Sequence, residues 1–264
     1  MKFKHFLFTF VVASLSVACT TVALTGRKQL SLVPDSQILA MSAESYSDFI
    51  KQSPLSNDKT KTEMVKRVGG KIASAVVTYM QSIGREADVA DYRWEYNLVQ
   101  SDDVNAFCMP GGKIVVYTGI LPVTKDENGL AVVLGHEIAH AVARHSSEQM
   151  SQQILLQTGG NVLSGLIGGA SQTTQNVVGT LYGLGGQLGT LKFSRQHEYE
   201  ADHLGLIFMA MAGYDPNGAV TFWQRMAQQS GGASIELLST HPSDASRITE
   251  IQKYLPEALK YYKK

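Results

Sequence analysis

The chain has 264 residues, enough for one large domain or two small ones with a proper hydrophobic core. Hydrophobic residues make up 44% of it and charged residues 17%, which is typical of a globular protein. Lys plus Arg and Asp plus Glu both number 23, so the net charge is zero; with no basic block either, the composition argues against nucleic acid as a partner.

The first residues have the form of an export signal. A lysine-containing start, an apolar run over 6–17 and small residues after it predict a signal peptide over 1–18. The apolar run is too short for a comfortable membrane span of ~20 residues. The sequence Ser-Val-Ala before Cys19 resembles the lipobox of bacterial lipoproteins, with Ser16 where Leu is usual. We therefore expect Cys19 to carry lipid, and an ordinary signal peptide is the alternative.

The chain then divides into a lipid-tethered arm over 19–34 and one folded domain over 35–264. Its other cysteine, Cys108, has no disulfide partner if Cys19 carries lipid. A small buried apolar role for Cys108 is the simplest interpretation, and a metal thiolate is the alternative.

Helices come first in the folded domain, and a small sheet follows. Turn residues and apolar periodicity predict a helix that begins at Pro34-Asp35-Ser36 and ends before Pro54, and a second helix over about 58–83. The alternating segment 92–99 predicts a half-buried strand. Two further strand candidates, 104–107 and 113–119, lie on either side of a Pro-Gly-Gly turn.

A long helix is expected from about Thr124 to Met150, with Thr124 and Glu127 as a capping box. Segment 149–191 follows and contains no charged residue or histidine. It predicts a mobile flap or helical hairpin close to the site, and a transmembrane hairpin is the alternative. Three more helices are expected: one around Glu198, one that begins at Asp215-Pro216, and a last one opened by "STHPSDASRI".

The long helix contains the sequence "HEIAH". His136 and His140 are about one turn apart, so both imidazoles leave the same face and can bind one zinc ion with Zn–N distances of ~2.0–2.1 Å. Glu137 projects on an adjacent face, where it can reach a water without binding the metal. This is the metalloprotease pattern H-E-x-x-H.

The surroundings of this motif support a metal. The helix is apolar nearly all round, so we expect it to be buried. Burying two histidines and a glutamate is costly unless they are satisfied, and a metal satisfies all three. The alternative is a pair of hydrogen-bonded core histidines. His145 lies beyond the apolar section and is expected at the surface.

A catalytic zinc needs three protein ligands and one open position. Glu198 and Asp202 are four residues apart and share a helical face, so Glu198 can bind zinc while Asp202 hydrogen-bonds a ligating histidine. Glu200 is expected in solvent or paired with Arg. His197 and His203 are expected to be structural or exposed.

H-E-x-x-H over 136–140 and S-R-x-x-E-x-x-A-D over 194–202 together resemble the zinc peptidase family of the HtpX heat-shock protease and the CaaX prenyl endopeptidase, metallopeptidase family forty-eight. Segments "TGRKQLSLVP", "NAFCMPGGKIVVYTGIL", "AGYDP" and "HPSDASRI" also resemble it. The soluble-domain branch, with mitochondrial Oma-type proteases and bacterial envelope lipoproteins, is the most similar. The resemblance implies an α+β, mainly helical zincin fold over 35–264, with a small sheet next to a long zinc-binding helix. It also implies Glu198 as third ligand and Glu137 as general base.

The segment "PGGKIVVYTG" would place an edge strand before the zinc helix. An extended peptide could pair with Gly112, Lys113, Ile114 and Val115 there; a strand paired on both sides is the alternative.

Two residues near the C-terminus resemble family positions close to the metal. His241 could stabilise the oxyanion or cover the zinc at rest, and a plain helix-start residue is the alternative. Arg247 could bind substrate or pair with an acidic side chain.

The sequence therefore predicts an endopeptidase with one Zn²⁺ per chain that cleaves unfolded or misassembled envelope proteins. The expected location is the cell envelope, as a lipid-anchored lipoprotein facing the periplasm, with the outer membrane favoured over the inner. A chaperone-like envelope assembly factor with latent protease activity is the main alternative. A further alternative is a zinc enzyme that hydrolyses something other than peptides.

Overall fold

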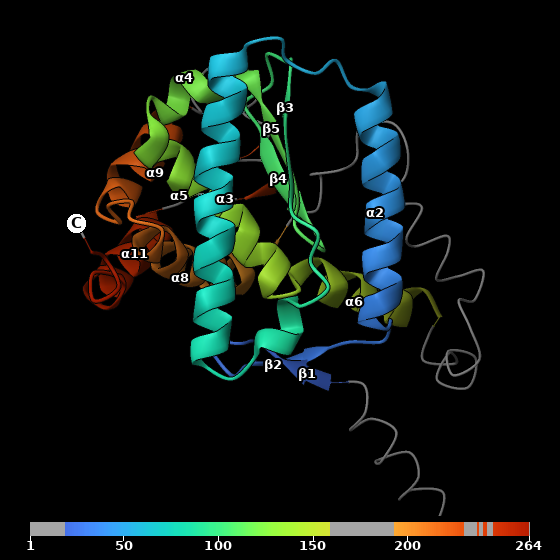
Figure 1. Ribbon diagram of the computed structural model, residues 1–264. Helices are drawn as coiled ribbons and strands as arrows, with labels where there is room; N and C mark the ends of the chain where they lie inside the picture. The colour runs from blue at the N-terminus through green and yellow to red at the C-terminus, as the bar shows by residue number, and fades with distance from the viewer. Residues whose placement is uncertain (1–18, 159–192, 230–236, 238–239, 242–244, 264) are drawn as a thin grey trace, which may run out of the picture.

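The computed structural model describes residues 19–158, 193–229, 237, 240–241 and 245–263 (Figure 1). Helices dominate and the sheets are small, which confirms the predicted α+β, mainly helical class. The predicted signal peptide and most of the predicted flap lie outside the described residues. Within the described ranges, no helix is both long and apolar enough to cross a membrane.

The segment expected to be an arm contains a β-hairpin. Strands β1 (Cys19–Thr21) and β2 (Lys28–Leu30) pair antiparallel. Val22 at the start of the connecting turn is buried in the main core, and the backbone N–H of Leu32 donates to the Ser151 hydroxyl at 2.9 Å. The hairpin is therefore docked on the folded domain, beside α6 (Figure 1).

A three-stranded sheet lies between two helices, α2 (Asp35–Gln52) and α3 (Lys59–Ser82), as Figure 1 shows. The strand order is β3 (Glu95–Val99), β5 (Lys113–Tyr117), β4 (Ala106–Met109). β3 runs parallel to β5, and β4 runs antiparallel to it. The second helix begins as predicted, because the Asp58 carboxylate caps it by accepting from the backbone N–H of Lys61.

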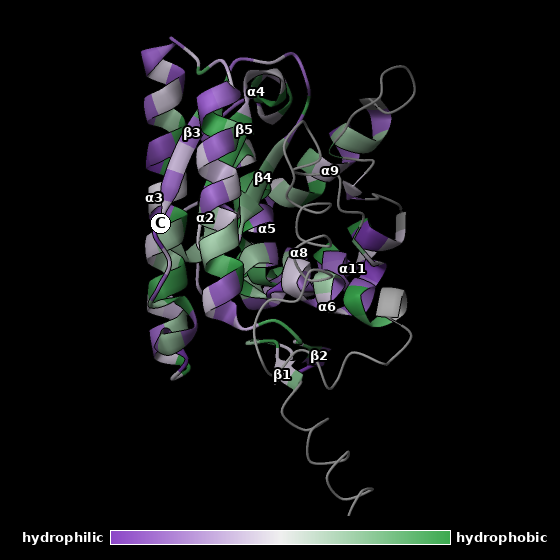
Figure 2. Cartoon of the chain, turned by 90° about the vertical axis from the view of Figure 1, so that its right-hand side faces the viewer, coloured by the Kyte–Doolittle hydropathy of each residue, from purple (hydrophilic) through white to green (hydrophobic). Residues whose placement is uncertain are grey.

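Both faces of this sheet are covered. Successive side chains of a strand point to opposite faces, and here Phe107 and Val115 pack toward α2 while Cys108 and Ile114 pack toward α3 and the zinc-motif helix. In Figure 2 the strands β4 and β5 are coloured mainly as hydrophobic. Cys108 is thus a buried apolar side chain, and burial raises the pKa of its thiol well above the ordinary value.

The prediction of an edge strand before the zinc motif is wrong, because that segment forms β5, the central strand of the sheet. Ile114 pairs with Tyr96 of β3 on one side and with Cys108 of β4 on the other. The parallel partner β3 comes before β4 in the chain and reaches β5 by a crossover, which no local pattern reveals. Among the described strands, β3 and β4 are the outer ones of this sheet.

The four residues expected to bind a peptide on β5 are therefore structural. Gly112 adopts φ +81° in the turn, and a Cβ there would come within 2.5 Å of an indole ring. Lys113 is buried, and its Nζ lies 2.5 Å from Glu95 Oε1. Ile114 and Val115 are fully buried and take part in the two cores. None of the four offers a free backbone edge to a substrate.

The zinc-motif helix begins later than predicted. Thr124 ends the short helix α4 (Leu121–Thr124), and α5 runs over Glu127–Val142. Its cap is Asp126, whose Oδ1 accepts from the backbone N–H of Gly129 at 2.8 Å. The expected capping box of Thr124 and Glu127 is absent for this reason.

This helix also ends earlier than Met150. Arg144 adopts φ +59°, which stops α5, and α6 (His145–Thr158) starts in a new direction. The guanidinium of Arg144 pairs with Asp35 Oδ2 at 2.8 Å and Asp88 Oδ1 at 3.4 Å. Because these partners come from distant segments, the sequence around Arg144 contains no sign of the break.

The described residues of the C-terminal part form the helices α8 (Arg195–Met211), α9 (Gly218–Gln229) and α11 (Ala245–Ala258). α8 packs closely on α5 where Gly135 meets Gly205, and a Cβ on Gly205 would lie 2.8 Å from the Gly135 carbonyl carbon. This contact lies next to His136 and one turn from Asp202. The two glycines therefore let α8 approach the zinc motif closely enough for side chains of both helices to meet.

Candidate metal centre

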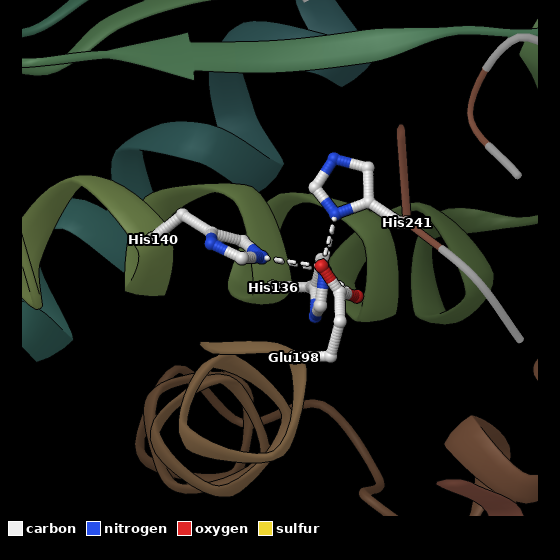
Figure 3. A group of neighbouring side chains, drawn as sticks. All are labelled: His136, His140, Glu198 and His241. Atoms are coloured by element: carbon white, nitrogen blue, oxygen red, sulfur yellow. Dashed lines mark hydrogen bonds and ion pairs between the residues drawn. The ribbon is translucent and has the colours of Figure 1, made fainter. Parts of the chain in front are cut away.

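Four side chains from three parts of the chain converge on one point (Figure 3). His136 and His140 come from α5, Glu198 from α8, and His241 from the segment before α11. All four are buried, and one ligand atom from each lies within 4.8 Å of the others. The structure thus brings the two motif histidines together with Glu198, as the sequence predicts, and adds His241.

The donor atoms have the spacing of a tetrahedral zinc site. His136 Nε2 lies 3.0 Å from His140 Nε2 and 3.1 Å from His241 Nδ1. Glu198 Oε1 lies 3.0 Å from His241 Nδ1 and 3.5 Å from His140 Nε2. Tetrahedral zinc with bonds of ~2.0–2.1 Å separates its ligand atoms by ~3.3 Å. Three nitrogens and a carboxylate at 3.0–3.5 Å therefore fit this ion.

The tautomer of His136 suits a metal ligand. His136 Nδ1 lies 2.9 Å from Asp202 Oδ1, so that nitrogen carries the proton of the neutral ring. Its Nε2 then presents a lone pair toward His140 Nε2, 3.0 Å away. His140 can donate to this lone pair in the absence of a metal, whereas with its proton on Nδ1 both Nε2 lone pairs are free to bind one cation between the two rings.

The position of Glu198 is set by the point at which α8 begins. The Ser194 side chain caps this helix by accepting from the backbone N–H of His197, and Glu198 lies in the first turn, where the helix dipole favours an anion. Burial alone would raise the pKa of Glu198, but the neighbouring His241 and Arg247 outweigh it and hold that pKa well below the ordinary value. Glu198 is thus an ionised carboxylate suited to a metal.

Arg247 is not available to a substrate. Its side chain is 1% exposed, with Nε 2.6 Å from Asp202 Oδ2 and Nη1 2.9 Å from Glu198 Oε2. Its guanidinium carbon also lies 3.7 Å from the centre of the Trp223 ring. The predicted substrate role is therefore wrong, and the alternative of pairing with acidic residues describes the structure.

Asp202 connects this arginine to the metal cluster. Burial would raise the pKa of Asp202, but the charge of Arg247 and their hydrogen bonds lower it. An ionised Asp202 accepts from His136 Nδ1, which leaves Nε2 of that ring directed at the cluster. This is the outer-shell geometry that orients a ligating histidine.

Glu137 lies beside the cluster without joining it. It is buried, and among the described residues its Oε1 has no hydrogen-bond partner. The Nε2 of His241 lies 3.6 Å from that oxygen. Burial raises the pKa of Glu137, which makes it a stronger proton acceptor than an ordinary glutamate.

The expectation that His145 lies at the surface is wrong. α6 begins at His145 directly after the break at Arg144, and there His145 is fully buried with its Nδ1 2.8 Å from His140 Nδ1. Sequence reasoning missed this contact because it depends on that break. His203 is half-buried and pairs with Glu257.

Relatives that match this chain include mitochondrial metalloendopeptidases and bacterial beta-barrel assembly-enhancing proteases. The chain is 42% identical to the mitochondrial metalloendopeptidase OMA1 of Schizosaccharomyces pombe over 178 residues, 64% of this chain and 49% of the relative. The human metalloendopeptidase OMA1 is 28% identical over 90% of this chain and 46% of its own. The beta-barrel assembly-enhancing protease of Escherichia coli is 29% identical over 75% and 39%. The chain spans about half the length of these relatives, or less.

These relatives overturn the predicted location. The expected place was the bacterial envelope, but five of the matching relatives are named as mitochondrial proteins and bacterial proteins match alongside them. Cys19, the predicted lipid site, is exposed at the first residue of β1. The signal segment on which its lipidation depends lies outside the described residues.

The match to a known family covers the whole cluster. The profile of peptidase family M48 matches residues 70–255, which include both zinc motifs, His241 and Arg247. Members of this family are zinc-dependent metallopeptidases, in agreement with the predicted cofactor and with the four grouped side chains. The chain therefore belongs to peptidase family M48.

Proposed function

We propose that this protein is a zinc-dependent endopeptidase. The observation that carries the proposal is the buried cluster of His136, His140 and Glu198 with Glu137 beside it, whose Oε1 accepts no hydrogen bond from the described residues. Three protein ligands and an adjacent carboxylate are what hydrolysis at a catalytic zinc needs. The relatives named as metalloendopeptidases support the same activity.

His136, His140 and Glu198 would hold the zinc, which supplies a Lewis acid for the scissile carbonyl and makes a water more acidic. Glu137 accepts the proton from that water and later passes it to the leaving amine. Burial raises the pKa of Glu137, which suits this double role because a more basic carboxylate accepts a proton more readily. Asp202 keeps His136 in the tautomer whose Nε2 faces the metal.

We further propose that the substrates are unfolded or misassembled proteins. Among the described strands β4 is an outer one of the sheet and packs beside α5, so an extended chain could pair with it and present a carbonyl to the cluster. Main-chain pairing selects for extended structure rather than for particular side chains. The Escherichia coli relative is named for the assembly of β-barrels, which fits a substrate that has failed to assemble.

Removal of the metal is the direct test of this function. Residues 20–264, treated with a chelator, are expected to lose casein cleavage and to recover it when one equivalent of zinc is added back. Elemental analysis should show about one zinc per chain in the active protein and none after chelation. Cleavage that continues at full rate in the zinc-free protein would disprove the proposal.

His241 supplies a second prediction. Its Nδ1 occupies one corner of the ligand tetrahedron, so in this conformation we propose that it covers the metal rather than stabilising an oxyanion. His241→Ala should therefore raise the rate of casein cleavage while weakening zinc binding by about tenfold or more. A lower rate with unchanged zinc affinity would instead assign His241 to the oxyanion.

A further inference from the structure

Arg27, in the turn between β1 and β2, bridges two glutamates of the folded domain. Its Nη1 and Nη2 lie 2.8 and 2.7 Å from the two carboxylate oxygens of Glu148 on α6. Its Nε lies 2.8 Å from Glu200 Oε2 on α8. The Thr25 hydroxyl donates to Glu200 Oε1 at 2.5 Å, so two hairpin residues converge on one buried carboxylate.

A directed chain of hydrogen bonds links this carboxylate to the metal cluster. His140 directs Nε2 at the other ligands, so its proton is on Nδ1 and is donated to His145 Nδ1, 2.8 Å away. The proton of His145 must then be on Nε2, which faces Glu200 Oε2 at 3.3 Å. The ligand role of His140 thus fixes the direction of every bond in the chain, and Glu200 accepts at its end.

We propose that Arg27 is a positioning residue for the metal ligand His140, acting through Glu200 and His145, so that docking of the N-terminal hairpin sets the zinc affinity of the site. The inference rests on the zinc site of the proposed function and deepens it. It gives a role to the "TGRKQL" segment, whose Thr25 and Arg27 side chains bind Glu200 and Glu148. Arg27 and Glu200 are 173 residues apart, so no local pattern marks the connection.

Rings and charges around His145 hold it in this position. The ring of His197 stacks on it with centroids 4.5 Å apart, and His197 Nε2 lies 3.1 Å from Glu148 Oε2. Arg27 therefore pairs with the acidic partners of both rings: Glu200, which contacts His145, and Glu148, which contacts His197. Without the guanidinium, two carboxylates remain in a mostly buried space with less positive charge, and Glu200 loses the group that orients it.

Arg85 is a matched control for Arg27. It also contacts the hairpin, with Nη2 3.0 Å from the Thr21 carbonyl oxygen, and it pairs with one acid, Asp88. Its side chain is 26% exposed, against 17% for Arg27. Among the described residues, no hydrogen bond or ion pair joins Arg85 to Glu148 or Glu200, so its loss weakens hairpin docking without removing a partner of Glu200.

The experiment measures the zinc dissociation constant by competition with a chromogenic chelator, for the full chain. Arg27→Gln is expected to raise it by about tenfold, as is usual when an outer-shell partner of a metal ligand is lost. Arg85→Gln should leave it within about twofold. The melting temperature of each zinc-free variant, measured in parallel, separates a general loss of stability from a loss of metal affinity.

A second variant keeps the test independent of folding. His145→Phe keeps a ring that can stack on His197 but removes the acceptor for His140 Nδ1, so it should raise the dissociation constant by about 10–100-fold. If Arg27 acts through His145, adding Arg27→Gln to His145→Phe should raise it little further. Effects that multiply in the double variant would overturn the proposed route.

The test of Arg27 can fail or succeed independently of the test of endopeptidase activity. An Arg27→Gln protein with unchanged zinc affinity would disprove the inference even if it cleaves casein normally. Conversely, if the unaltered chain binds zinc but cleaves nothing, the endopeptidase proposal fails while the zinc affinities still decide the role of Arg27. A lower melting temperature with unchanged zinc affinity would assign Arg27 to hairpin docking alone.

Discussion

Glu137→Gln is expected to abolish peptide cleavage while zinc remains bound. The amide has nearly the same shape as the carboxylate, and Glu137 is not one of the four grouped ligands, so the metal site should persist. The amide cannot accept a proton from water, and loss of a general base typically lowers kcat by about 10²–10⁴-fold. Casein hydrolysis and zinc content, measured on the same sample, check the two halves of this prediction.

Glu127→Gln is the matched control, because Glu127 starts the same helix but is partly exposed and pairs with Arg67. It should leave both kcat and zinc content unchanged. Cleavage retained by Glu137→Gln would remove the proposed mechanism. If that variant still suppresses aggregation of an unfolded protein as well as the unaltered chain does, the chaperone-like alternative gains support.

Arg247→Met is expected to destabilise the zinc-free protein by about 3–5 kcal/mol, the range for breaking a buried ion pair from one side. Arg247 is 1% exposed and holds the carboxylates of Glu198 and Asp202. Methionine fills much of the same space, but it leaves two buried carboxylates without their cation. Urea unfolding of zinc-free protein measures the loss as a change in the free energy of unfolding.

Lys253→Met on the same helix is the control. Lys253 is 61% exposed and pairs with Glu250 one turn away, so its loss should change the free energy of unfolding by less than about 1 kcal/mol. A substrate-binding Arg247 would behave differently: KM would rise and the unfolding curve would stay the same. That result would contradict the structural role assigned here.

Much of the site could be predicted from sequence because its residues stand at helical spacing. The four-residue spacing of His136 and His140 places both rings on one face whatever the rest of the chain does, and the spacing of Glu198 and Asp202 does the same on another helix. The apolar residues around the first motif predict burial, and the structure buries the whole of α5 from Gly129 to Val142. These predictions rest only on local geometry.

Two of the predictions that failed depended on which element a segment would pack against. The order of strands in a sheet is decided by crossovers, so the sequence of Lys113–Tyr117 could indicate a strand but not whether it lies at an edge. The sequence could not decide the partner of Arg247 for the same reason. Its charge suits a substrate or an acid equally well, and only the packing of α11 on α8 decides between them.

The sequence by itself determined that two histidines and a glutamate share a buried helix, that a second acidic motif follows, and that the two resemble a zinc peptidase. The tertiary structure alone decided that α5 breaks at Arg144. His145, directly after the break, contacts His140, and through it the metal cluster is connected to the N-terminal hairpin. The physical reason is distance along the chain. A helix repeats every 3.6 residues and so relates near neighbours, whereas the ion pairs of Arg144 and Arg27 join segments that only folding brings together.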